Sequence, residues 1–241
     1  MAALQTTDVW FRKLIRLMDL NNAEREALAA LPFTLEKTSA NRYLVKEGEK
    51  VTRCCLLVEG YVARHKMNRE GKRQIVSFHM PGDMVDLQHS LLPTADHNIQ
   101  TMTAATVAWV PIPSLAEVAS LFPRIAAAFA KDALIDASVF REWVLNVGAR
   151  DAKTRIAHML CEFLQRREAL GIATAEALDL PFTQEQIGDA TGLTSVHVNR
   201  MLRELVEDGA FTRIGRTLRV SDWRKLKAIA DFDPAYLHQA A

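Results

Sequence analysis

The chain has 241 residues, which suits two domains better than one. Hydrophobic residues make up 49% of it and charged residues 24%, and this mix excludes a disordered chain or a collagen-like repeat. The formal net charge is only +1, so any surface that binds a polyanion must be a local patch. Three cysteines, two of them adjacent at Cys54 and Cys55, cannot form a disulfide framework.

Targeting and membrane signals are weak in this sequence. No apolar stretch reaches the roughly 18–20 residues that a membrane span needs. The first residues mix acids and bases before the apolar core of a signal peptide could build up. Together with the cysteine usage, these features predict a cytoplasmic protein with no membrane partner.

The N-terminal half changes from a helical to a β pattern. The first thirty residues have the apolar spacing of helices, and Asn22 is expected to cap a helix over residues 23–31. After Pro32, short β-type runs alternate with glycines 11 or 12 residues apart, which predicts a small antiparallel β-roll. The turn glycines are Gly48, Gly60, Gly71 and Gly82. The expected strands are Tyr43–Val45, Cys54–Val58, Tyr61–Ala63, Ile75–Phe78 and a longer segment, Thr101–Ile112.

A long apolar helix is predicted next. Residues 125–147 contain no glycine or proline and are apolar nearly all round, and Gly148 is expected to end the helix before another begins at Ala149. Such a helix needs two surfaces to bury against. One is its own β-roll, and the second is the same helix of a partner chain in a two-fold dimer; the alternative is burial inside one monomer. The expected dimer interface comprises Ile125, Phe129, Ile135, Val139, Phe140, Trp143 and Val147.

The most informative pattern lies in residues 181–220. Thr183 and Gln186 form a capping box before a short helix that ends at Gly192. Thr194 can cap a second helix over residues 195–208. Two alternating runs, residues 210–214 and 217–220, then predict a β-hairpin wing. The sequence therefore predicts a winged helix-turn-helix, whose second helix can enter a DNA major groove.

The charge of this segment fits a DNA-binding surface. Residues 194–219 contain five arginines against three acids. Arg200 is the best candidate for reading a base, because a guanidinium pairs bidentately with guanine. The expected base-reading residues are Arg200, Asn199, His197, Ser195 and Val196. The expected phosphate contacts are Thr183, Thr194, Arg203, Arg213 and Arg216. The alternative is a solvated helix face, or a helix-turn-helix used for protein contacts only.

In this order, the elements resemble the CRP/FNR transcription regulators over nearly the whole chain. The matching strings are Val45-Lys46-Glu47-Gly48-Glu49, Leu57-Val58-Glu59-Gly60-Tyr61-Val62, Pro81-Gly82-Asp83 and Gly192-Leu193-Thr194 with Arg200. The resemblance implies an α+β fold with a β-roll, a dimerisation helix and a winged helix-turn-helix over residues 1–122, 123–148 and 149–241. It also implies a homodimer that binds double-stranded DNA at palindromic promoter sites and contacts RNA polymerase, with the β-roll as a sensor or vestigial sensor.

The sequence departs from the family's ligand signatures. Members that bind cyclic nucleotides carry Gly-Glu-Leu and Arg-Ser/Thr-Ala, where this chain has Asp86-Leu87-Gln88 and His97-Asn98-Ile99. A phosphate buried without a cation is costly, so neither cAMP nor cGMP is expected. Iron–sulfur members use an N-terminal cysteine set, and residues 1–53 contain no cysteine. We therefore expect no cofactor and no metal, and the small-molecule effector stays unidentified.

Two alternatives involve a metal. A haem-based gas sensor would use a histidine shortly after the Pro81-Gly82-Asp83 turn, and His89 lies one residue out of step with that place. A cupin-like metal-dependent enzyme would need two or three histidines and a carboxylate at tight spacing. The chain has no His-x-His, and its nearest pair, His89 and His97, is eight residues apart. A regulator rather than an enzyme is therefore expected.

Overall fold

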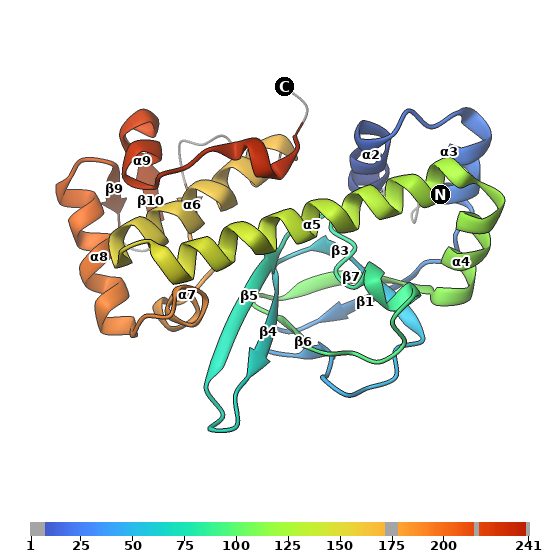
Figure 1. Ribbon diagram of the computed structural model, residues 1–241, viewed down its shortest axis with the longest axis horizontal. Coiled ribbons are helices and arrows are strands. Elements are labelled where there is room, and N and C mark those ends of the chain that lie inside the picture. The colour runs from blue at the N-terminus through green and yellow to red at the C-terminus, as the bar shows by residue number, and fades with distance from the viewer. Residues whose placement is uncertain (1–7, 172–177, 215–216, 240–241) are drawn as a thin grey trace. The chain divides into compact units, whose positions relative to one another are not determined.

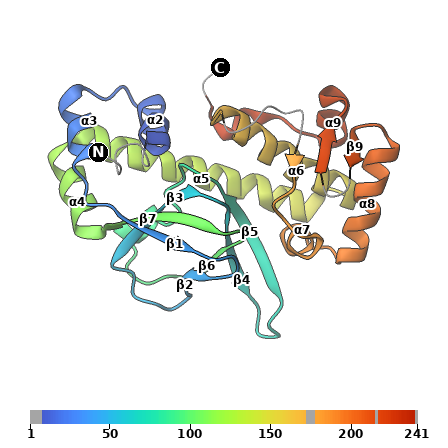
Figure 2. The same cartoon turned by 180° about the vertical axis from the view of Figure 1, so that it is seen from behind.

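The computed structural model describes residues 8–171, 178–214 and 217–239 (Figures 1 and 2). The chain forms two compact units. The first contains Met1–Lys66 and Ser77–Ala137, and the second contains Met67–Val76 and Ser138–Ala241. In the described part of the chain, every helix is too short or too polar to cross a bilayer.

Seven strands in two antiparallel sheets form the roll. One sheet has the order β1-β7-β3 and the other the order β2-β6-β4-β5. The first sheet comprises β1 (Thr34–Thr38), β7 (Ala105–Pro111) and β3 (Arg53–Glu59). The second comprises β2 (Tyr43–Val45), β6 (Asn98–Thr101), β4 (Val62–Met67) and β5 (Arg73–His79). The predicted α+β class with an antiparallel β-roll is confirmed.

Two details of the predicted strands are wrong. The expected segment 101–112 is two strands, β6 and β7, separated by residues 102–104, and its last residue begins a helix. That helix, α4 (Ile112–Leu121), was not predicted from the sequence. It carries Pro113 in its first turn, where a missing N–H costs nothing, so this proline opens a helix rather than closing a strand.

Helices cover one face of the β1-β7-β3 sheet, as Figures 1 and 2 show. They are α2 (Asp8–Leu17), α3 (Asn22–Ala29), α4 and the first part of α5 (Pro123–Ala149). The α3 helix begins one residue earlier than expected, because Asn21, not Asn22, forms a capping box with Glu24. The buried apolar layer between these helices and the sheet includes Trp10 and Leu14.

Strand β3 is buried on both faces. Cys54 and Leu56 face the helices, whereas Cys55 and Leu57 belong to the core between the two sheets. The adjacent cysteines therefore point to opposite sides of the strand and are free thiols. The predicted turn glycines are also confirmed: Gly48, Gly60, Gly71 and Gly82 all have φ between 78° and 92°.

The helix α5 continues through Gly148 to Ala149, so the prediction that Gly148 ends it is wrong. A glycine costs a helix only about 1 kcal/mol, which packing outweighs. The next helix, α6 (Ala152–Ala169), begins at Asp151, whose carboxylate accepts from the backbone N–H groups of Lys153 and Thr154.

The C-terminal elements form a winged helix-turn-helix. Its helices are α7 (Gln184–Thr191), α8 (Ser195–Glu207) and α9 (Trp223–Ile229), followed by a 3-10 turn, η2 (Pro234–Leu237). Its sheet has the order β8-β10-β9, with β8 (Leu178–Asp179), β9 (Phe211–Ile214) and β10 (Thr217–Val220). The helix-turn-helix and the hairpin strands agree with the predicted ranges within a residue, and β8 was not predicted.

Candidate nucleic-acid interface

The turn between α7 and α8 is fixed by side-chain caps. The Thr183 hydroxyl accepts from the Gln186 backbone N–H at 3.2 Å, and the Gln186 side chain accepts from the Thr183 N–H at 2.8 Å. Gly192 ends α7 with φ of 72°, a left-handed conformation that suits glycine. Thr194 caps α8 by accepting from the His197 N–H at 3.3 Å. All three sequence expectations for this turn are confirmed.

Gly188 permits the close approach of the turn to α7. A Cβ atom at this position would collide with the carbonyl oxygen of Leu193. The Leu193 backbone N–H also donates to the Gly188 carbonyl at 3.0 Å. This contact sets how α8 leaves the turn. The contact between Gly188 and Leu193 was not predicted, although the spacing of two glycines four residues apart, Gly188 and Gly192, is visible in the sequence.

The buried face of α8 determines which side chains point outward. Its apolar residues are buried, as expected: Val198, Met201, Leu202 and Leu205. Of the expected base-reading residues, Ser195, Val196 and Arg200 are exposed, and His197 and Asn199 are half-buried. The α8 helix thus presents its first two turns to solvent, which is the part of a recognition helix that contacts base edges.

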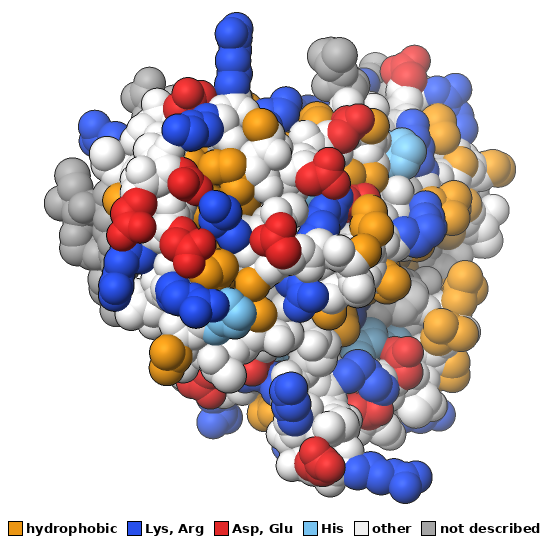
Figure 3. Space-filling view, turned by 60° about the vertical axis from the view of Figure 1, so that its left-hand side comes forward, with side chains coloured by type: hydrophobic (Ala, Val, Ile, Leu, Met, Phe, Trp, Pro, Cys, Tyr) orange, Lys and Arg blue, Asp and Glu red, His pale blue; other side chains and the backbone are white. Residues whose placement is uncertain are grey.

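Arg200 is held in place by two neighbours on the same helix. Its Nη2 lies 2.9 Å from Nε2 of His197, and its Nε lies 3.9 Å from Oε1 of Glu204. Arginine can only donate, so Nε2 of His197 is the acceptor in this contact. The Arg200 side chain is still 65% exposed. Basic and acidic side chains are intermixed on this side of the chain (Figure 3).

The structure describes the side chains of only some of the residues expected to contact phosphates. Thr183 and Thr194 are exposed, and each hydroxyl accepts a backbone N–H while keeping its own proton to donate. Arg203 is exposed on α8. Arg213 belongs to β9, but its side chain lies outside the described part, and Arg216 lies outside the described residues altogether.

The residues expected at a dimer interface have unequal exposure on α5. Buried within their own chain are Ile125, Phe129, Val139 and Trp143. Half-buried are Ile135, Phe140 and Val147. The large apolar side chains that remain exposed are different ones: Leu134 (68%), Val144 (74%) and Leu145 (46%). A partner chain would therefore meet these three rather than the four buried residues.

A buried cation occupies the β-roll. Arg64, on β4, places Nη1 2.8 Å from Oδ2 of Asp136 and donates from Nη2 to the Val85 carbonyl. Burial opposes ionisation of Asp136, but Arg64 and His79 outweigh it and lower the pKa of this carboxyl. Neither cAMP nor cGMP was expected because His97-Asn98-Ile99 replaces the family's arginine motif, and Arg64 is a cation outside that motif. The cation is committed to Asp136, so a phosphate would have to compete with a carboxylate for it.

The three thiols are buried in apolar surroundings. Burial, followed by the charge of Asp86, raises the pKa of Cys54 and Cys55. Burial also raises the pKa of Cys161, which lies in the core. Because the thiolate is the reactive form, these cysteines are inert at neutral pH.

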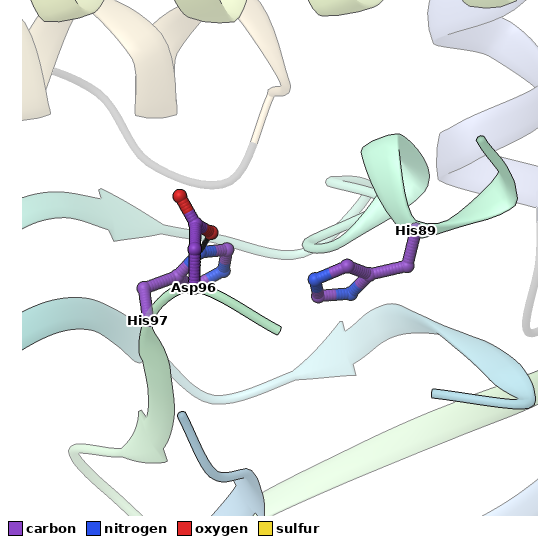
Figure 4. Close-up of side chains that lie close together, drawn as sticks. All are labelled: His89, Asp96 and His97. Atoms are coloured by element: carbon purple, nitrogen blue, oxygen red, sulfur yellow. Dashed lines mark hydrogen bonds and ion pairs between the residues drawn. The ribbon is translucent and has the colours of Figure 1, made fainter. Parts of the chain in front are cut away.

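His89 and His97 lie side by side, although eight residues separate them in sequence. Their ring centroids are 5.5 Å apart and the rings are 14° from parallel (Figure 4). Burial, and then the Arg64 charge, lower the pKa of His97 to about 4, so this ring is neutral at pH 7. A haem bound at His89 would have to displace the neighbouring His97 ring.

Comparison with known families matches both halves of the chain. The family model described as a cyclic nucleotide-binding domain matches residues 35–120. The family model described as a Crp-like helix-turn-helix domain matches residues 154–229. The first match covers the strands of the roll, and the second covers α6 to α9.

Similar proteins are described as bacterial regulators. An anaerobic regulatory protein of Aggregatibacter actinomycetemcomitans is 23% identical, over 86% of this chain and 80% of its own. The nitrogen fixation regulation protein FixK of Bradyrhizobium diazoefficiens is 26% identical, over 80% of each chain. Among solved structures, FixK2 from Bradyrhizobium japonicum superposes with a TM-score of 0.75 and 25% identity, covering 83% of this chain and 98% of that chain.

Proposed function

Because the chain belongs to the CRP/FNR family of DNA-binding transcription regulators, we propose that it acts as a homodimer on a two-fold symmetric promoter site. In this proposal α8 lies in the major groove, and Arg200 reads a guanine in each half-site. The observation that carries it is the outward first half of α8, where Ser195, Val196 and Arg200 are exposed above a buried apolar face.

The contacts of Arg200 in the DNA-free protein are compatible with this role. Its contacts with His197 and Glu204 are at the surface, where ion pairs contribute little, so exchanging them for a guanine edge is inexpensive. A bidentate guanidinium–guanine pair contributes about 1–3 kcal/mol of discrimination against a wrong base. His197, Asn199, Ser195 and Val196 would line the remaining contacts to bases.

Phosphate contacts would hold the helix in register. The hydroxyls of Thr183 and Thr194 lie at the N-termini of α7 and α8, where backbone N–H groups and the helix dipole favour an anion. Arg203, together with Arg213 and Arg216 of the wing, would supply the cations. Such contacts position the protein without carrying sequence information.

The exposed apolar side chains of α5 support the proposed dimer. Leu134, Val144 and Leu145 are large hydrophobic residues of one helix, with exposed fractions from 46% to 74%. Each Å² of this apolar surface that a partner chain covers would contribute about 25 cal/mol to the free energy of dimerisation. Pairing α5 with its copy around a two-fold axis covers the same residues on both chains.

The β-roll would be an effector domain or a vestigial one. Arg64 is engaged by Asp136, and Asp86-Leu87-Gln88 replaces the family's nucleotide signature, so a cyclic nucleotide is not the proposed effector. RNA polymerase is the proposed protein partner at the promoter.

Substitution of Arg200 tests the proposal. We expect Arg200→Ala to lose discrimination between the specific site and random duplex DNA, whereas Arg216→Ala weakens binding to both about equally and makes the salt dependence shallower. Arg42→Ala, which removes an exposed arginine of the β-roll, is the control and should bind as the wild type does. Titration of labelled duplexes at several salt concentrations measures all three. Full discrimination by Arg200→Ala would show that another residue reads the bases.

A further inference from the structure

Two imidazoles and a carboxylate converge at one edge of the β-roll. His89 belongs to the 3-10 turn η1 (Leu87–Ser90), and Asp96 and His97 come directly before β6 (Figure 4). One donor atom from each of the three residues lies within 4.8 Å of the other two. All three residues belong to the first compact unit.

The ring of His89 is buried without a hydrogen-bond partner. The residue is 2% exposed, and neither ring nitrogen forms a hydrogen bond. Nδ1 lies 3.8 Å from Oδ2 of Asp86, an oxygen that is itself buried and without a hydrogen bond. Each such atom costs about 1–3 kcal/mol when it is left unsatisfied. An ion bound at Nε2 of His89, with Nδ1 turned to Asp86, would satisfy all three atoms.

His97 has the surroundings of a metal-binding imidazole. Its Nδ1 lies 2.6 Å from Oδ1 of Asp96, and its Nε2 lies 3.3 Å from the side-chain nitrogen of Gln88. The contact keeps the Asp96 carboxylate beside the His97 ring, so both residues can donate to the same ion. The Asp96 side chain is 83% exposed, which gives an ion a path from solvent to the buried rings.

The local charge suits a divalent ion. Asp86, Asp96 and Asp136 are neighbouring carboxylates, and Arg64 and Lys66 are neighbouring cations; Lys66 donates to the Asp96 carbonyl and pairs with Glu47. With Glu47 counted, four carboxylates against two cations leave two formal negative charges. Arg64 is paired with Asp136, which offsets part of its charge.

We infer that His89, His97 and Asp96 bind one divalent transition-metal ion, with Asp86 positioning the His89 ring. Two imidazoles and a carboxylate suit Zn²⁺, Fe²⁺, Co²⁺ or Ni²⁺, whereas Mg²⁺ and Ca²⁺ prefer oxygen donors alone. Three protein ligands leave a coordination position for water or a small molecule. The site is independent of the DNA-contacting residues proposed above.

The test is a titration of the chelator-treated full-length protein with Co²⁺, followed by absorption, and with Zn²⁺, followed by calorimetry. We expect one ion per chain, and no binding of Mg²⁺ under the same conditions. Asp96→Asn should lower the affinity by a factor of at least about 10, and His97→Gln should lower it further. Because Asp96 is exposed, its variant keeps the fold, which circular dichroism checks.

Two control variants separate this site from non-specific binding. Asp19→Asn removes a carboxylate whose side chain is 96% exposed, and His158→Gln removes a buried imidazole of the second unit. Both should bind Co²⁺ and Zn²⁺ as the wild type does. The inference is overturned if the wild type binds neither ion, or if Asp96→Asn and His97→Gln bind them as tightly as the two controls do.

Discussion

Arg200 shows how one side chain can be both exposed and ordered. The His197 ring lies 2.9 Å from its guanidinium one turn away, so the side chain is directed along the helix surface. Restricting a long side chain before binding lowers the entropy cost of a specific contact. Arg200 therefore combines access to DNA with pre-organisation.

His158 is a buried residue whose protonation is coupled to folding. Nδ1 lies 3.2 Å from the Ala230 carbonyl oxygen, and Nε2 lies 3.2 Å from the Tyr236 hydroxyl. Burial, and then the charge of Arg150, lower the pKa of His158 from 6.5 to about 4. The unfolded chain takes up this proton as the pH falls below 6.5, but the folded chain does so only near pH 4. This residue thus makes folding less favourable as the pH falls through that window.

We predict that His158→Gln reduces the acid sensitivity of the protein. The contribution of His158 is fully present above pH 6.5, and its loss towards pH 4 amounts to about 3 kcal/mol. Urea unfolding at several pH values between about 7 and 4 measures it. The control is His197→Gln, which leaves the buried network intact and should follow the wild type. Equal slopes for His158→Gln and the wild type would contradict the assignment.

Paired residues were the hardest feature to predict from the sequence. The helix caps at Thr183 and Thr194 depend on atoms three residues apart, so local patterns identified them. His89 and His97 meet only because the fold brings η1 beside the residues before β6, and nothing in their spacing in the sequence indicated it. The pairing of Arg64 with Asp136 spans 72 residues and was missed for the same reason.

At the level of elements, two glycines in helices have opposite roles. Gly188 in α7 has the Leu193 carbonyl where a Cβ would be, whereas Gly148 in α5 has nothing within 4 Å of that position. Gly188 is therefore required by packing, and Gly148 is only tolerated.

We predict that alanine at the two positions shifts stability in opposite directions. Gly188→Ala should lower the free energy of unfolding by about 1–3 kcal/mol, because a backbone oxygen must move. Gly148→Ala should raise it by about 0.5–1 kcal/mol, because alanine is the better helix former. Chemical denaturation of both variants beside the wild type measures the shifts. A neutral Gly188→Ala would show that the turn between α7 and α8 is looser than the structure indicates.

Elements with strong local signals were predictable, and weak ones were not. Turn glycines and β-branched runs located β2 to β5, and the capping box at Thr183 and the Thr194 cap located α7 and α8. The short β8 has two residues and no periodicity to detect. The strand β1 is polar and mostly exposed along its length, so it lacks an alternating pattern. Its place beside β7 follows from backbone pairing rather than from side chains.

The whole molecule combines a β-roll with a winged helix-turn-helix, the two domains of the CRP/FNR regulators. The exposed apolar residues of α5 are where a second copy of the chain would pair with the first. Two recognition helices related by a two-fold axis contact half-sites whose centres are about 34 Å apart, one turn of DNA. A two-fold dimer of the protein would therefore predict a two-fold symmetric binding site on DNA.

Selection of bound duplexes from a random DNA pool tests whether the protein binds DNA as a two-fold dimer whose Arg200 reads a guanine in each half-site. The account predicts an enriched sequence with two inverted half-sites centred about 10 base pairs, or one helical turn, apart, and a guanine in each that Arg200→Ala no longer selects. Enrichment of a single unrepeated half-site, or of no sequence at all, would contradict it.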